Sequence, residues 1–143
     1  MHERIVYVSQ VAPGIGARDA YDIIRVAHNR NSRFGLTGAL ILVDGHFLQV
    51  LEGDGFRLRE RYARIATDPR HTGVELRQSR SIQELSFVGE WMALRHDGEV
   101  DQATRDAHGY VPGFPVDRFD GERLVAFALA CCGSHLGGRP PAG

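Results

Sequence analysis

The sequence predicts an α+β fold of the ferredoxin-like type, with a five-stranded mixed sheet, two helices on one face of that sheet and a C-terminal helical extension. In the first 95 residues, short β-rich runs alternate with segments of helical periodicity in the order β-α-β-β-α-β-β. Two of these runs flank the dipeptide Asp44-Gly45, which is typical of a two-residue hairpin turn. A further apolar helical pattern follows a stretch rich in Gly and Pro.

The first strand and the first helix are predicted at 4–9 and at about 17–31. The strand is rich in β-branched residues and is closed by a Pro-Gly loop. In the helix, apolar residues recur at helical spacing, and Asn31 lies seven residues after Ile24 on the same face. The pattern therefore places a carboxamide on the buried side of this helix.

Capping and turn signals predict the remaining elements of the core. Asp54 is a suitable N-cap for a second helix to about Ala66, and the segment from Asp68 to His71 ends that helix. The residues of this helix that should face the core are Leu58, Tyr62 and Ile65. The remaining strands are expected at 39–43, 46–52, 74–82 and 87–94.

Residues 1–95 are expected to form one domain and residues 96–136 a C-terminal helical extension. The extension contains a capped segment that is apolar on nearly every side from Leu124 to Cys132. Because a small domain seldom exposes such a surface, this helix should pack on the core or in an oligomer interface. The last residues, 137–143, carry Gly and Pro and are expected to be disordered.

The composition is that of a single globular domain rather than of a disordered chain. The chain has 143 residues, 43% of them hydrophobic, and a net charge of −1. With 17 basic and 18 acidic residues, it lacks the basic field that gathers nucleic acid. All 17 basic residues are arginine, which excludes Schiff-base lysines and Walker-type phosphate loops. We find neither a signal sequence nor a membrane-spanning stretch, so we expect a cytoplasmic protein without a membrane partner.

The cysteines and histidines do not form a recognisable metal or disulfide motif. Cys131 and Cys132 are adjacent within the apolar helical segment and are predicted to be small buried hydrophobic residues. The seven histidines are scattered and lack the spacing of a zinc site. We therefore expect no metal site.

Three hydrogen-bonding side chains are predicted to converge on one apolar slot. Strand alternation places Gln49 between Phe47 and Leu51, and an unpartnered buried amide costs about 1–3 kcal/mol. In this topology the strand of Tyr7 lies beside that of Gln49, and Asn31 arrives from the first helix. Two interpretations stay open: a satisfied Tyr–Gln pair in an ordinary core, or a pocket for a planar ligand with polar edges.

Four blocks of the sequence resemble the BLUF domain, a sensor of blue light that uses flavin. They are the strand with Tyr7, Asn31 with the following Gly35-Leu36-Thr37-Gly38, the block from Asp44 to Gly53 with Gln49, and Asp68-Pro69-Arg70-His71. The resemblance covers roughly residues 3–95 with the family's spacing between blocks. It implies the same ferredoxin-like fold and makes residues 1–95 the flavin-binding photosensor domain.

The resemblance implies an FAD held non-covalently between the two helices, with FMN also possible. Asn31 and Gln49 would bond the edge of the isoalloxazine ring, and Gln49 would bridge to the Tyr7 hydroxyl. In the family, blue light is thought to move an electron and then a proton from this tyrosine to the flavin, which leaves the glutamine rotated or tautomerised. A stronger hydrogen bond toward flavin O4 then gives a small red shift of absorption.

The resemblance also assigns residues around the rest of the flavin. Ile24 would pack on the ring. Three arginines are candidates to lie by the ribityl or phosphate groups of the flavin: Arg30, Arg64 and Arg70. The alternative is that they are ordinary solvated residues on helix faces. His71, in the same block as Arg70, is a further cofactor-binding candidate. Arg30 departs from the family, because many relatives have Asn or His at that position.

The last strand of the photosensor domain carries a second departure. Met92 matches the family's methionine, which would couple the flavin pocket to the sheet edge, although a lone methionine on a strand is often a core residue. The family usually has Trp two residues before this Met, whereas Trp91 directly precedes it here and Glu90 takes the expected place. Alternation would turn Trp91 to the face opposite Met92.

The sequence thus predicts a blue-light photoreceptor rather than an enzyme, with output through protein–protein interaction. No cyclase, phosphodiesterase or helix-turn-helix pattern follows the core, so the expected partners are an unidentified downstream protein and further copies of the chain. The alternative is a light-independent ferredoxin-like interaction or oligomerisation module without flavin. A small enzyme of the acylphosphatase type is a weaker third, because its phosphate-cradling loop is not matched.

Overall fold

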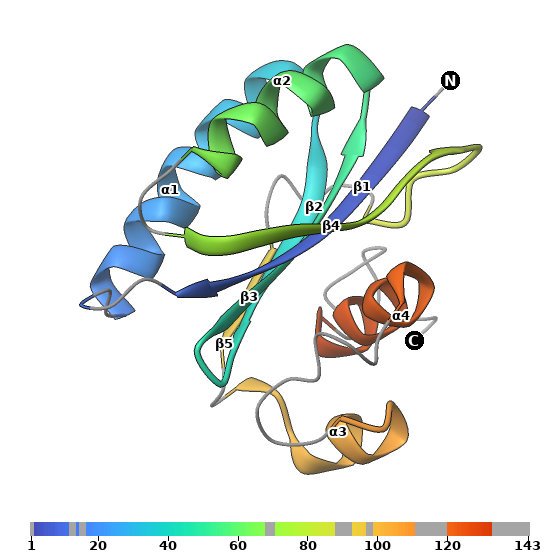
Figure 1. The fold of residues 1–143 in the computed structure, drawn as a ribbon. Helices are drawn as coiled ribbons and strands as arrows, with labels where there is room; N and C mark the ends of the chain where they lie inside the picture. Colours follow the sequence, from blue (N-terminus) through green and yellow to red (C-terminus); the bar gives the residue numbers. More distant parts are fainter. Residues whose placement is uncertain are drawn as a thin grey trace, which may run out of the picture.

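The computed structural model of the protein describes residues 2–11, 14, 17–67, 71–87, 93–96, 99–110 and 120–132. These residues form three layers (Figure 1). Two helices lie over one face of a β-sheet, and a C-terminal helix lies over the other face. The α+β class and the two helices on one face of the sheet are therefore confirmed.

Among the described residues, the sheet has five strands and is mixed, as the sequence predicts. The strands are β1 (His2–Val11), β2 (Thr37–Val43), β3 (His46–Gly53), β4 (His71–Ile82) and β5 (Ala93–His96). Their order in the sheet is β4-β1-β3-β2-β5. All neighbours are antiparallel except β2 and β5, which are parallel. The first and third strands therefore lie side by side in the centre of the sheet.

The helices of the first layer are α1 (Ala17–Phe34) and α2 (Gly55–Ala66). The predicted N-cap of α2 is confirmed, because the Asp54 carboxylate accepts a hydrogen bond from the backbone N–H of Arg57 at 3.1 Å. The predicted core stripe of α2 is also confirmed. Its members Leu58 and Ile65 are buried, and Tyr62 is partly buried against the same cluster.

Two turns that contain residues with positive φ angles close the β2–β3 hairpin and end α1. Asp44 and Gly45 have φ of 46° and 76°, and a type I′ turn requires positive values at both positions, so the predicted hairpin is confirmed. Gly35 has φ of 71° and ends α1 at Phe34, beyond the predicted end at Asn31. α1 therefore ends before Gly35, which can adopt the left-handed conformation, and the polar side chain of Asn31 does not end it.

The predicted strand from Phe87 to Leu94 is wrong at Phe87, and its residues 88–92 lie outside the described part of the chain. The backbone N–H groups of Ser86 and Phe87 donate to the Glu52 carboxylate at 2.7 and 3.1 Å, and both residues lie in a bend. β5 comprises Ala93–His96, within the predicted range and beyond it at its end. A side chain of β3 thus accepts the hydrogen bond from Phe87 N–H that a strand beginning at this residue could have used in the sheet.

The C-terminal part contains α3 (Gln102–Ala107) and α4 (Gly121–Cys132). The sequence did not predict α3, because this helix has no buried residue and so no apolar stripe. The apolar side chains of α4 share one hydrophobic cluster with residues of β1, β2 and β3 on the second face of the sheet. Among the described helices, none is both long enough and apolar enough to cross a bilayer. The segment 137–143 lies outside the described residues.

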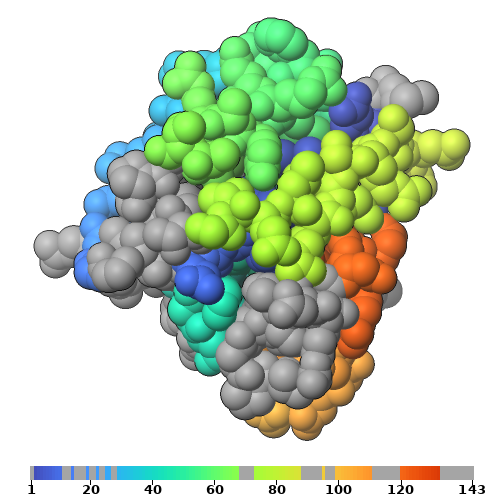
Figure 2. Space-filling model, viewed as in Figure 1, coloured from blue at the N-terminus to red at the C-terminus, as the bar shows by residue number. Residues whose placement is uncertain are grey.

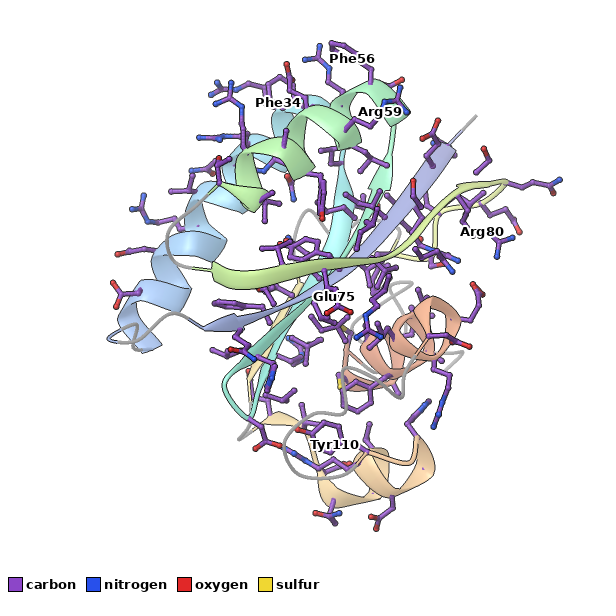
Figure 3. The ribbon with its side chains drawn as sticks, in the orientation of Figure 1. Phe34, Phe56, Arg59, Glu75, Arg80 and Tyr110 are labelled. Carbon is purple, nitrogen blue, oxygen red and sulfur yellow. The ribbon has the colours of Figure 1, made fainter. Side chains whose placement is uncertain are left out.

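Tyr110 joins the C-terminal part to the hairpin between β2 and β3 (Figure 3). Its ring stacks on the ring of Phe127 in α4, with centroids 5.5 Å apart and an angle of 7° between the planes. Its hydroxyl donates a hydrogen bond to the carboxylate of Asp44 in the turn. The position of α4 is thereby fixed against the turn between β2 and β3.

The two cysteines of α4 provide a test of its packing. Cys131 and Cys132 are buried, as the sequence predicts, and burial raises the pKa of the Cys131 thiol to about 12. At pH 8 only about one such thiol in ten thousand is ionised, and the thiolate is the reactive form. We therefore expect the thiols of the native protein to react with a thiol-specific disulfide reagent far more slowly than those of the unfolded protein. In guanidinium chloride, both thiols should react.

A Ser32→Cys variant is the control, because Ser32 is exposed on α1. This variant should gain a single fast-reacting thiol in the native state. Fast reaction of both natural thiols in the native protein would contradict the packing of α4 against the sheet.

Candidate functional site

Tyr7 and Gln49 lie directly opposite each other in the antiparallel pair of β1 and β3. The Tyr7 hydroxyl donates a hydrogen bond to the side-chain oxygen Oε1 of Gln49. Tyr7 is fully buried and Gln49 is 5% exposed. The structure therefore brings the phenol and the carboxamide together, with the carboxamide oxygen directed toward the tyrosine.

The surroundings of this pair are apolar. The side chains buried with Tyr7 in one cluster under α1 and α2 are Ile5, Leu36, Leu40, Phe47, Leu51, Leu58 and Ile65. The ring of Tyr62 in α2 meets the Tyr7 ring edge to face, with centroids 5.7 Å apart. Because little water reaches this layer, the hydrogen bond of the pair is electrostatically stronger than the same bond in water.

Asn31 lies in the last turn of α1 and is fully buried. Its backbone carbonyl oxygen accepts a hydrogen bond from the N–H of Leu36 at 2.9 Å, which fixes the end of the helix before β2. α1 covers the face of the sheet that carries the Tyr7–Gln49 pair (Figure 1). The helix layer therefore contains a second buried carboxamide.

A groove with several arginines lies between α1 and α2. It is lined by Arg30, Arg33 and Phe34 of α1 and by Glu60 and Arg64 of α2. Arg30 is partly buried and Arg64 is exposed, so the groove opens to solvent. The structure thus brings together two of the arginines that the sequence assigns to the outer part of a cofactor.

The other predicted site residues are not brought together by the described part of the structure. Ile24 lies in α1 and His71 begins β4, but their side chains are outside the described part. Arg70 and the segment 88–92, which contains Met92 and its two preceding residues, also lie outside it. The roles of these residues stay predictions.

The sequence analysis missed a buried ion pair on the opposite face of the sheet. Arg4 and Glu52 lie opposite each other in β1 and β3, with Nη1 and Oε2 3.4 Å apart. Strand alternation could have revealed it, because it groups Arg4 with Val6 and Val8 on one side of β1. A charged residue in such a row requires a partner.

A family model described as sensors of blue-light using FAD, abbreviated BLUF, matches residues 3–93. The photoactivated adenylate cyclase subunit beta of Euglena longa is 37% identical over 87 residues, which are 61% of this chain and 10% of that protein. The corresponding subunit of Euglena gracilis is also 37% identical over 87 residues. The chain thus spans about a tenth of the length of these curated relatives.

Solved structures agree with the family match over a larger share of the chain. The dark state of BlrB, a BLUF protein, has a TM-score of 0.73 and 26% identity, and the match covers 90% of this chain and 97% of that one. The ground state of BlsA has a TM-score of 0.77 and 25% identity, with 89% and 85% covered. The chain therefore belongs to the BLUF family, the sensors of blue light that use FAD.

Proposed function

We propose that this protein is a blue-light photoreceptor that holds flavin non-covalently between α1 and α2. It signals through a light-driven rearrangement of the hydrogen bonds among Tyr7, Gln49 and the flavin. The observation that carries the proposal is the hydrogen bond from the buried Tyr7 hydroxyl to Gln49 Oε1, in an apolar layer beneath two helices. A carboxamide has a donor end and an acceptor end, and the acceptor end of Gln49 faces the tyrosine.

The chemistry of these side chains fits the edge of a flavin. Flavin O2 and O4 accept hydrogen bonds and N3–H donates one, so an edge of this kind is matched by carboxamides, which have both donors and acceptors. Asn31 and Gln49 are the two buried carboxamides of the described residues. Arg30 and Arg64 line a groove open to solvent, which suits the phosphates of FAD or FMN. Arg70, His71 and Ile24 are further ligands proposed from the family's pattern.

The bound flavin would supply absorption of blue light and a place for an electron. Tyr7 has a phenol that can release an electron and a proton, and its proton already lies on the bond to Gln49. Rotation of the Gln49 side chain would exchange the end that faces Tyr7 for the end that faces the ring, and tautomerisation would instead move a proton from the nitrogen to the oxygen and change which end donates. Every hydrogen bond of the site then changes while few atoms move. A glutamate at position 49 would lack this pair of unlike ends.

The output is proposed to pass through protein–protein contacts rather than through conversion of a substrate. The match to BlrB, a BLUF protein, over 90% of this chain and 97% of that one supports this. A homo-oligomer and a downstream protein are the proposed partners, and Met92 is the proposed link to the sheet edge. The cytoplasmic location and the lack of nucleic-acid and membrane partners stay predictions.

Absorption spectroscopy of the purified protein tests the photoreceptor directly. The protein should be yellow, and blue light should shift its flavin band reversibly to the red. Gln49→Leu should keep the flavin and lose the shift, because leucine has no donor or acceptor to exchange. Gln102→Leu is the matched control, since Gln102 is exposed on α3, and it should shift as the unchanged protein does.

A normal shift in Gln49→Leu would show that the mechanism is wrong. A colourless protein that refuses added FAD and FMN would instead favour the light-independent interaction module.

The second variant removes only the Tyr7 hydroxyl. In Tyr7→Phe, Gln49 Oε1 loses a buried donor, so the free energy of unfolding should fall by about 1–3 kcal/mol. The light-induced shift should be lost as well, because phenylalanine cannot give up an electron and a proton. Urea unfolding and the absorption spectrum measure the two effects.

The control is Tyr62→Phe, at a half-buried position on α2, which should change the free energy of unfolding by less than about 0.5 kcal/mol and keep the shift. Retention of the full shift in Tyr7→Phe would remove the tyrosine from the mechanism.

A further inference from the structure

The face of the sheet under α4 contains a buried pair of opposite charges. Arg4 is 7% exposed and Glu52 is fully buried, although both are charged residues. Burial of an ion pair is tolerated when the geometry is good and the remaining polar atoms are satisfied. The contacts of these two side chains show how that condition is met.

Glu52 uses its second carboxylate oxygen to hold the chain that leads to β5. Its Oε1 accepts hydrogen bonds from the backbone N–H groups of Ser86 and Phe87 at 2.7 and 3.1 Å. Phe87 is fully buried in the same hydrophobic cluster as the apolar residues of α4. A displacement of Glu52 therefore moves this bend and the packing of Phe87 together.

Arg4 uses its other two nitrogens, Nη2 and Nε, to contact the first turn of α4 and the strand β4. Its Nη2 lies 3.3 Å from Oε2 of Glu122, and its Nε donates to Oε1 of Gln78 in β4 at 2.9 Å. The same oxygen of Glu122 accepts hydrogen bonds from Gln78 Nε2 at 2.9 Å and from Arg80 Nη1 at 3.2 Å. The charges of this cluster balance, with two guanidinium groups and two carboxylates.

The junction between α4 and β4 is also sterically tight. A Cβ atom added at Gly121 would lie 2.6 Å from the Cβ of Gln78. The hydrogen bond from Gln78, aided by Arg4 and Arg80, lowers the pKa of Glu122 and keeps its carboxylate charged. On the molecular surface, α4 lies directly beside β4 (Figure 2). The start of α4 therefore follows any movement of the strands that hold it.

The charged cluster and the photoactive pair share the same two strands. Arg4 lies three residues before Tyr7 on β1, and Glu52 lies three residues after Gln49 on β3. An odd spacing along a strand places the two pairs on opposite faces of the sheet. A change in the twist or separation of β1 and β3 at one pair is thus felt at the other.

We propose that Arg4 and Glu52 are positioning residues that couple the Tyr7–Gln49 pair to α4 and to the 83–87 bend, so that light changes how firmly both are held. The inference rests on the proposed function, because it assigns the path by which the rearrangement at Gln49 reaches the other face. A purely structural ion pair would stabilise the fold to the same extent in the dark and in the light.

Hydrogen exchange followed by mass spectrometry tests the coupling on the full-length, flavin-loaded protein, in the dark and under continuous blue light. In the unchanged protein, light should alter the exchange rates of amides in α4 and at 83–87 by roughly two- to thirty-fold, as for residues that transmit coupling between sites. The absorption shift is recorded on the same samples.

Two variants and a control separate the contacts of the cluster with α4 from its contacts with residues 83–87. Glu52→Gln keeps an oxygen for Ser86 and Phe87 but removes the charge that holds Arg4, so the light effect at α4 should be lost. Glu122→Gln changes a side chain that is 60% exposed, so it should fold normally, and it should lose the light effect at α4 while keeping that at 83–87. Glu99→Gln, at an exposed position outside both the cluster and the groove between α1 and α2, should behave as the unchanged protein does. All of these proteins should show a normal red shift.

The inference is overturned if the unchanged protein shows a normal red shift without any light effect at α4. It is also overturned if Glu122→Gln retains the full effect at α4, and this result decides the matter even if Glu52→Gln does not fold. A missing red shift in the unchanged protein would instead overturn the proposed function itself, and this inference with it.

Discussion

The antiparallel register between β1 and β3 is the constraint on which the rest of the structure depends. It places Tyr7 opposite Gln49 on one face of the sheet and Arg4 opposite Glu52 on the other. A slip of one residue would turn each of these side chains to the wrong face. The type I′ turn at Asp44-Gly45 fixes β3 against β2, and the Tyr110 hydroxyl holds that turn from the C-terminal side. These contacts hold β3 in its place beside β2, and the pairing with β1 is built on that strand.

The two faces of these strands differ in the kind of interaction they carry. Under the helices, a neutral phenol and a neutral carboxamide meet among apolar side chains. Such a pair can exchange donor and acceptor ends without moving a charge into an apolar region. Under α4, charge-assisted hydrogen bonds hold Arg4, Glu52 and Glu122 in fixed positions. A rearrangement that costs little free energy at the Tyr7–Gln49 pair is therefore connected, through the same two strands, to the charged cluster under α4.

Local patterns were sufficient to predict the parts of the fold that local interactions determine. Strand alternation, the Asp44-Gly45 turn and the Asp54 cap act over a few residues, and each was correctly predicted. The same alternation predicted that Tyr7 and Gln49 share a face. The strand expected from Phe87 was wrong at that residue, because the N–H of Phe87 donates to a carboxylate 35 residues earlier in the chain. α3 was missed because a short polar helix without buried residues leaves no periodic apolar pattern.

The central claim is that Gln49 stands between Tyr7 and a flavin ring, and a crystal structure of the flavin-loaded protein kept in the dark tests it most directly. The account predicts density for a tricyclic ring between α1 and α2, with the Gln49 side chain within hydrogen-bond distance of both the ring edge and the Tyr7 hydroxyl. A slot filled by protein side chains alone, with the flavin bound elsewhere or absent, would contradict it.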